Sequence, residues 1–338
     1  MTNNEINVLS LFDGMSCGRV ALQRSIHNVG NYFASEVDKY AITVSNNNHD
    51  NNQLGDVCNW MEWDIDFSKI DLVLAGSPCQ GFSFTGKQLG FDDPRSKLFF
   101  IFIDILNYIK SVNPNVKFLL ENVQMKKEYL NVITDMLQVE PILINSSLVS
   151  AQNRKRYYWC NWEVSQPEDQ GIVLKDVLEN GDNSIWIKNR GEWYEREDKA
   201  MCLDANYFKG VDIHGQRSMV RSDSPVRSGI MVGRRLNEDG KREDNNKDIP
   251  LVQRIEVRGH DKTGTLTTAL KDNLVCKTDT QEYRKLTPIE CERLQTLPDN
   301  YTQGVSNTQR YKMLGNGWTV DVISHLLNCL KEEANDGN

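Results

Sequence analysis

The sequence predicts an α/β protein built on a doubly wound sheet, with a second, smaller and irregular β-rich domain. Two observations predict this class. Up to about Trp162, short apolar runs alternate with amphipathic stretches, which is the pattern of consecutive βα units. From about Pro167 to Tyr283 this period is lost, and Gly, Asn, Asp, Arg and Ser dominate around short strand-like pieces.

The individual elements follow from the apolar periodicity and the helix-start signals. The expected strands are Ile6 to Phe12, Tyr32 to Val37, Asp71 to Ala75, Val116 to Leu120, Ile142 to Leu148 and Tyr157 to Asn161. The expected helices are Gly18 to Asn28, Lys39 to Asn47, Ser96 to Ser111, Lys126 to Gln138, Thr287 to Leu294 and Val320 to Glu333. The helix at Thr287 is marked by Thr-Pro-Ile-Glu, which has the spacing of a capping box.

Composition and charge exclude several classes. No apolar run reaches the length of a membrane span, and the N-terminus lacks a basic-then-apolar signal pattern, so we expect a cytoplasmic protein without membrane contact. The eight cysteines form no CxxC pair, and the five histidines show no ligand spacing, so no metal site is expected. The net charge is −8, yet residues 209–262 carry 12 Lys/Arg against 9 Asp/Glu, which mildly favours a nucleic-acid contact there.

A cofactor site is predicted where the first strand meets the first helix. Phe12, Asp13, Gly14 and Gly18 lie at this turn, where glycines let the backbone pass close to a ligand and the helix N-terminus faces it. Glu36 follows the second strand, where a carboxylate can accept hydrogen bonds from two ribose hydroxyls. These features alone fit NAD, FAD or S-adenosylmethionine, although the Gly14-x-x-x-Gly18 spacing departs from GxGxxG.

A reactive pair is predicted at the ends of two later strands. Cys79 lies just past one apolar run, behind Pro78, and Glu121 lies after the next. The carboxyl ends of parallel strands line a common crevice, so both side chains are expected to face one substrate. A thiolate beside a carboxyl group suits attack on an electron-poor ring whose nitrogen must be neutralised, which points to a pyrimidine base. The alternative is a buried thiol and an ordinary carboxylate at the end of a strand.

Eight ordered motifs carry a resemblance to the DNA (cytosine-5) methyltransferase family, from Val8 to about Leu330 with a gap between about Gln166 and Tyr283. They are Phe12 to Gly18, Glu36, Asp56, Ser77-Pro78-Cys79-Gln80, Glu121-Asn122-Val123, Gln152 to Arg156, Leu286 to Gln295, and Gly315-Asn316-Gly317-Trp318. The resemblance implies a Rossmann-like S-adenosylmethionine-dependent methyltransferase sheet with residues 1–165 as the catalytic domain, 166–284 as the target-recognition domain and 285–338 as helices completing the catalytic domain. Ser77, where many members have proline, favours the bacterial, phage or animal de novo subgroup.

The resemblance also implies a role for each matching residue. Cys79 would add to C6 of a flipped cytosine, Glu121 would hydrogen-bond N3 and the amine, Arg156 would contact O2, and Arg154 would organise Glu121 or a phosphate. Phe12 and Asp56 would contact the adenine and Glu36 the ribose of S-adenosylmethionine. The pocket would be completed by Asp13, Gly14, Gly18, Pro78, Asn316, Gly317 and Trp318. Without the resemblance, the two arginines fit a solvated edge strand equally well.

The partner implied is double-stranded DNA, bound by a monomer as part of restriction and modification. The expected DNA contacts are Gln80, Ser83, Arg217, Arg234, Arg235 and Thr265. Most arginines in this region fit a solubilising surface equally well. Three alternatives remain: a tRNA cytosine methyltransferase, a non-catalytic DNA-binding relative, and a nicotinamide oxidoreductase, which the Cys79 loop and Glu121 disfavour.

Overall fold

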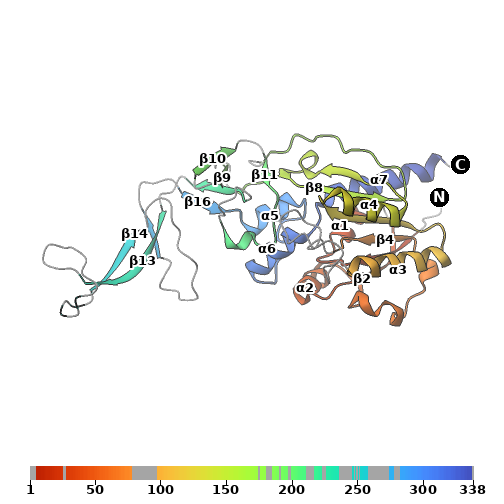
Figure 1. The fold of residues 1–338 in the computed structure, drawn as a ribbon, viewed down its shortest axis with the longest axis horizontal. Coiled ribbons are helices and arrows are strands. Elements are labelled where there is room, and N and C mark those ends of the chain that lie inside the picture. Colours follow the sequence, from red (N-terminus) through yellow and green to blue (C-terminus); the bar gives the residue numbers. More distant parts are fainter. Residues whose placement is uncertain are drawn as a thin grey trace.

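The computed structural model describes residues 5–25, 28–77, 97–173, 176–179, 185–189, 192–196, 199–210, 217–222, 226–235, 246, 248, 250, 252–257, 274–277 and 282–336. Figure 1 shows an elongated molecule with an α/β body at one end and a narrow β structure at the other. No helix among the described residues is both long and apolar enough to cross a membrane.

The body is built on a seven-stranded sheet in the order β3-β2-β1-β4-β5-β8-β6. The strands are β1 (Ile6–Leu11), β2 (Val29–Ser35), β3 (Asn52–Gln53), β4 (Leu72–Ala75), β5 (Lys117–Val123), β6 (Ile142–Asn145) and β8 (Lys155–Cys160). The first five in this order run parallel, whereas β8 runs antiparallel to both β5 and β6. The predicted α/β class is confirmed, and the reversed strand is the feature that βα alternation does not reveal.

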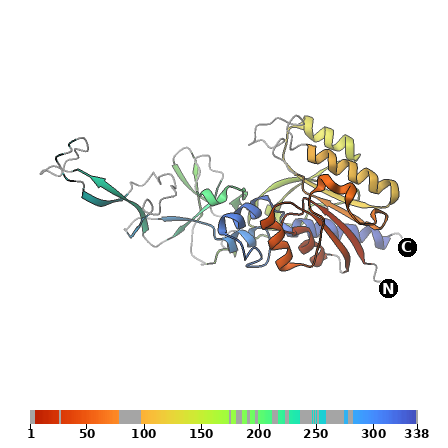
Figure 2. The ribbon, with the colours of Figure 1, turned by 90° about the horizontal axis from the view of Figure 1, so that it is seen from below.

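Two separate apolar cores cover the two faces of this sheet, because side chains alternate along each strand. On one face, residues such as Val8 and Leu74 pack with α1 (Cys17–Ser25), α2 (Lys39–Asn48) and α7 (Val320–Asp336). On the other face, residues such as Leu9 and Val73 pack with α3 (Lys97–Val112) and α4 (Lys127–Leu137). Figure 2 shows the yellow and orange helices and the blue α7 on opposite sides of the strands.

Two further helices lie beside the sheet. The capping box predicted at Thr287 is present: its side chain accepts from the Glu290 amide, the Glu290 carboxylate accepts from the Thr287 amide, and α5 (Pro288–Leu294) follows. The helix α6 (Asn307–Asn316) was not predicted, because its sequence shows no strong apolar stripe. Short 3₁₀ helices connect other elements: η1 (Val57–Glu62), η2 (Phe67–Lys69), η5 (Ser146–Leu148) and η7 (Tyr207–Lys209).

The remaining strands form the β-rich part, which Figure 1 shows extending away from the body. One sheet has the order β10-β9-β12-β16 and another the order β14-β13-β15. These strands are β9 (Ile185–Asn189), β10 (Glu192–Arg196), β12 (Met219–Ser222), β13 (Val226–Arg234), β14 (Val252–Val257), β15 (Leu274–Lys277) and β16 (Glu282–Lys285). A short pair, β7 (Gln152–Asn153) with β11 (Ala200–Met201), joins this part to the body. The three domain boundaries stay predictions.

Candidate active site

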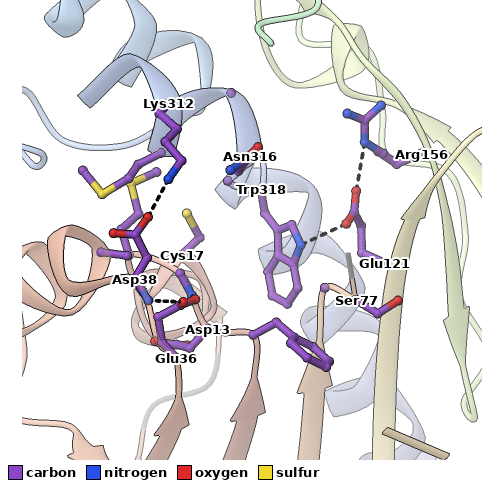
Figure 3. A pocket seen from close by; sticks show the side chains of 18 of the residues that line it. Asp13, Cys17, Glu36, Asp38, Ser77, Glu121, Arg156, Lys312, Asn316 and Trp318 are labelled. Carbon is purple, nitrogen blue, oxygen red and sulfur yellow. Dashed lines mark hydrogen bonds and ion pairs between the residues drawn. The ribbon is translucent and has the colours of Figure 1, made fainter. Parts of the chain in front are cut away.

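A pocket of about 310 Å³ lies beyond the carboxyl ends of β1, β2, β4 and β5, closed on the far side by α6 and the start of α7 (Figure 3). Its lining includes these predicted residues: Phe12, Asp13, Gly14, Glu36, Glu121, Arg154, Arg156, Asn316, Gly317 and Trp318. It also includes residues that were not predicted as site residues: Met15, Cys17, Asp38, Ala41, Gly76, Ser77, Asn122, Val123, Lys312, Met313 and Gly315. The fold thus brings the first and last motifs of the chain together.

The turn between β1 and α1 has an unusual backbone. Phe12, Gly14 and Ser16 have positive φ angles of 57°, 60° and 65°, so the chain folds tightly at the pocket floor. Gly18 does not line the pocket, contrary to the prediction. A Cβ there would lie 2.9 Å from Leu74 Cδ1 and 3.1 Å from the Tyr32 hydroxyl, so glycine at this position allows α1 to pack closely on the sheet.

The Asp13 carboxylate stabilises this turn from within. It accepts hydrogen bonds from Ser16 Oγ at 2.5 Å and from the Tyr32 hydroxyl at 2.7 Å. Burial raises the pKa of Asp13 to about 6, partly offset by the hydrogen bonds from Ser16 and Tyr32. The side chain of Asp13 therefore acts mainly as a structural acceptor in the pocket wall.

Glu36 is held by backbone amides at the mouth of the pocket. Its Oε2 accepts from Gly14 N at 2.8 Å, and its Oε1 accepts from Val37 N at 2.7 Å and Asp38 N at 2.8 Å. Oε2 retains capacity for another hydrogen bond, such as one from a ribose hydroxyl. Beside Glu36, the Asp38 carboxylate at the start of α2 forms an ion pair of 2.8 Å with Lys312 of α6 (Figure 3).

The half of the pocket lined by Phe12, Asp13, Glu36 and Asp38 has groups that fit S-adenosylmethionine. An aromatic ring at Phe12 is available to an adenine, and Asp13, Glu36 and Asp38 provide carboxylates in the same half. A positively charged sulfonium ligand suits such surroundings, whereas a pyrophosphate is repelled by them. The tight β1–α1 turn is accordingly compatible with S-adenosylmethionine without a GxGxxG loop.

Asp56 lies outside this lining. It is exposed, and its carboxylate accepts from Cys58 N at 2.9 Å, which makes it the N-cap of η1. Its predicted contact with an adenine amino group stays a prediction.

Glu121 forms the opposite end of the pocket and is 8% exposed. Its Oε1 pairs with Arg156 Nε at 3.0 Å, and its Oε2 accepts from Trp318 Nε1 at 3.2 Å (Figure 3). The indole therefore connects the carboxylate to the chain segment that closes the cofactor half. Two donors fix the carboxylate in one orientation, as a group acting on a bound ring requires.

Arg154 does not contact Glu121, which was one role predicted for it, whereas the predicted contact of Arg156 with O2 of the base stays a prediction. Arg154, 3% exposed, donates to the carbonyl oxygens of Leu203 (3.1 Å), Gly315 (3.1 Å) and Gly317 (2.9 Å). It thus supports the turn between α6 and α7, whereas Arg156 is the arginine that pairs with Glu121. Both guanidinium groups also reach Cys202 Sγ, so they do lie on one side of the chain as expected.

The loop expected to carry the nucleophile lies outside the described residues. The predicted site residues Pro78, Cys79, Gln80 and Ser83 belong to this loop. The chain is described up to Ser77, which is 4% exposed, lines the pocket and accepts from Asn122 Nδ2 at 3.1 Å. This bond ties the end of β4 to the residue after Glu121.

The predicted DNA contacts are only partly described. Arg217 pairs with Asp204 at 3.2 Å and donates to the Gly210 carbonyl at 3.1 Å, so it has a structural role. Arg235 is partly exposed just after β13, and Arg234 ends that strand, although its side chain is outside the described part. Thr265 also lies outside the described residues. In the described ranges, no three His, Cys, Asp or Glu side chains are grouped to hold a metal ion.

Comparison with known proteins agrees with this geometry. The model of the C-5 cytosine-specific DNA methylase family matches residues 6–332. The Type II methyltransferase M1.ScrFI of Lactococcus lactis subsp. cremoris is 28% identical over 94% of this chain and 75% of its own length. M.NlaX of Neisseria lactamica, also a Type II methyltransferase, is 27% identical over 96% of each chain. The structure of the Entamoeba histolytica methyltransferase EhMeth superposes with a TM-score of 0.63 at 17% identity, covering 98% of this chain and 99% of that one, which supports the fold.

The fold and pocket define an S-adenosylmethionine-dependent methyltransferase. The chain belongs to the C-5 cytosine-specific DNA methylase family. The predicted family, enzyme class, methyl donor and DNA substrate are thereby confirmed, and the nicotinamide oxidoreductase alternative is excluded. Among the residues that were not predicted, Asp38 and Lys312 line the pocket as an ion pair, and Cys202 contacts both arginines of the site. Asp38 has a detectable signal as a helix N-cap, but the other two carry none in the sequence.

Proposed function

We propose that this enzyme methylates C5 of a cytosine flipped out of duplex DNA, with Cys79 as the nucleophile that adds to C6. The observation that carries the proposal is the fixed Glu121 carboxylate, held by Arg156 and Trp318 in the pocket that Ser77 also lines. Cys79 follows Ser77 by two residues, and extended chain spans at most about 3.6 Å per residue, so the thiol stays within reach of that pocket.

The chain's own groups divide the chemistry between them. The Cys79 thiolate forms a bond to C6, and the electron pair displaced from the C5–C6 bond makes C5 nucleophilic. In this step Glu121 must carry a proton, which it donates in a hydrogen bond to N3 of the base, and this stabilises the negative charge that develops there as the thiolate adds to C6. Arg156 orients Glu121 through their 3.0 Å contact. Once C5 carries the transferred methyl group, loss of the C5 proton to water breaks the C6–S bond, expels the thiolate and restores the C5–C6 double bond.

S-adenosylmethionine, when bound, supplies an electrophilic methyl group. Phe12 and Glu36 would hold its adenosine, while Asn316, Gly317 and Trp318 would close the pocket from the opposite side. Arg154 supports that closing turn through the Gly315 and Gly317 carbonyls. Trp318 also donates a hydrogen bond to Glu121, the residue expected to bind the base, so the positions of cofactor and base both depend on the Trp318 side chain.

The DNA is expected to lie between the body and the β-rich part. C6 of a stacked cytosine is hidden from any side chain, so the base must leave the helix before attack. We propose that Gln80, Ser83, Arg234, Arg235 and Thr265 contact this DNA and that the enzyme acts as a monomer in the cytoplasm. Relatives named Type II methyltransferases support a role in restriction and modification.

Replacement of Cys79 tests the mechanism. Cys79→Ala is expected to abolish methylation while S-adenosylmethionine binding, measured by calorimetry, is retained; Cys58→Ala, which removes an exposed cysteine, serves as the matched control. Duplex DNA containing 5-fluorocytosine should form a covalent complex with the wild type that survives denaturation. A Cys79→Ala enzyme with parental turnover, or no stable complex, would disprove the nucleophile assignment. Parallel assays on duplex DNA and tRNA decide between the two polymer substrates.

A further inference from the structure

Cys202 occupies a position between the two arginines of the site. Its Sγ lies 3.3 Å from Arg154 Nη1 and 3.8 Å from Arg156 Nη2, so it contacts both guanidinium groups. As a thiol it also donates to the Leu203 carbonyl at 3.3 Å, a bond that ionisation would exchange for stronger contacts with the two arginines. Arg156 also forms an ion pair with Glu121, and Arg154 also donates hydrogen bonds to the Gly315 and Gly317 carbonyls. The sulfur thus links the group that holds the base to the turn that closes the cofactor pocket.

The backbone on either side of Cys202 is fixed. Met201 ends β11, which pairs with β7, and its amide donates to Ser218 Oγ at 2.8 Å. The amide of Leu203 donates to Gln152 Oε1, also at 2.8 Å, and both Gln152 and Leu203 are buried. The position of Cys202 is therefore determined by its neighbours, and its contact with the arginines is built into the fold.

The charges around Cys202 favour an anion. Arg154 and Arg156 contribute two positive charges and Glu121 one negative charge, so a thiolate completes the balance. The nearby Asp204 carboxylate is paired with Arg217 instead. Burial alone would raise the pKa of the Cys202 thiol, but the positive charges of Arg154 and Arg156 outweigh it and bring the pKa below the ordinary value.

We propose that Cys202 is a positioning residue for methyl transfer: its thiolate bridges Arg154 and Arg156 and so holds Arg156 against Glu121. This inference rests on the function proposed above for Glu121. Arg154 has three backbone carbonyl partners that keep it in place without the sulfur. Arg156 keeps its bond from Nη1 to the Lys155 carbonyl at 2.9 Å, so loss of the sulfur is expected to change the orientation of its guanidinium group against Glu121, and through it the chemical step more than cofactor binding.

The first test measures ionisation and needs no activity. The ultraviolet absorbance of thiolates is titrated against pH for the wild type, Cys202→Ser and Cys58→Ser. The signal lost in Cys202→Ser should titrate at a lower pH than the signal lost in Cys58→Ser, because burial and Asp56 raise the pKa of Cys58. A Cys202 signal that titrates at or above that of Cys58 refutes the thiolate bridge.

The second test separates positioning from packing. Cys202→Ser, a neutral side chain of similar shape, should lower kcat about tenfold, the order expected when a charge-assisted hydrogen bond is lost, with KM for S-adenosylmethionine changed less than about twofold. Cys202→Asp restores a negative charge and should recover most of kcat. In the wild type, kcat should fall at low pH as the Cys202 thiolate is protonated. This fall should be absent in Cys202→Asp.

The outcomes distinguish this inference from the proposed function. If the wild type methylates DNA and forms the 5-fluorocytosine complex while Cys202→Ser matches it at every pH, only the inference about Cys202 is wrong. If Cys202→Asp is as slow as Cys202→Ser while both melt like the wild type, the charge has no role. If the wild type forms no covalent complex, the proposed mechanism is wrong, whereas the thiolate titration still reports on Cys202.

Discussion

Replacement of Trp318 by phenylalanine tests whether the indole orients Glu121. The change removes the Nε1 donor, which lies 3.2 Å from Glu121 Oε2, and keeps an aromatic ring in the same space. A hydrogen bond to a charged acceptor contributes about 1.5–3 kcal/mol. The rather long distance places this bond at the lower end, about 1.5 kcal/mol, which corresponds to about a tenfold fall in kcat.

The matched control is Trp162→Phe. Its indole nitrogen donates to the Leu326 carbonyl at 3.0 Å in a buried site that does not line the pocket. Both variants should lose similar stability in urea unfolding, because each leaves a small cavity and an unpaired acceptor. Steady-state methylation should separate them, with kcat falling only in Trp318→Phe. Equal kcat values in the two variants would refute the proposed orientation of Glu121 by Trp318.

Three further predictions concern stability. Gly315→Ala should lower the free energy of unfolding by about 3 kcal/mol, since a Cβ would lie 2.2 Å from the carbonyl carbon of Asp204; an unchanged urea midpoint would contradict this packing. Arg310→Met should cost about 3 kcal/mol, because it leaves the fully buried Glu292 carboxylate without its 2.8 Å ion partner; thermal melting measures the loss, and parental melting would argue against the pair. Burial raises the pKa of Asp13 to about 6, so the folded protein holds that proton more tightly than the unfolded chain. Stability should therefore fall by at most about 3 kcal/mol as pH rises from about 4 to about 6, and Asp13→Asn should flatten that part of the pH curve in urea titrations.

The sequence predicted the sheet and most helices because their signals are local. Apolar runs locate the strands, and the capping box locates α5 to within a residue. The antiparallel direction of β8 was not predicted, since strand direction depends on how the chain returns to the sheet. Helix α6 was missed because its residues gain their stability from the body they pack against, not from an apolar stripe of their own.

The site residues also divide into those with a local signal in the sequence and those that depend on distant parts of the chain. Glu36 follows β2 and Glu121 lies near the carboxyl end of β5, so their place at the pocket could be inferred from topology alone. The partners of Arg154 and Arg156 could not, because Cys202 is 48 and 46 residues away along the chain. Asp56 matches a family motif, yet its local turn satisfies its carboxylate away from the pocket.

The pairing of β7 with β11 limits how sequence specificity can be exchanged between related enzymes. Residues 199–210 follow the predicted start of the recognition region, yet Ala200, Leu203 and Tyr207 are buried in the same core as α1 and α7. A chimaera that replaces everything from residue 166 would remove these side chains together with the support for Arg154. A graft that keeps residues 199–210 together with Ser218 and Met219 leaves these contacts intact.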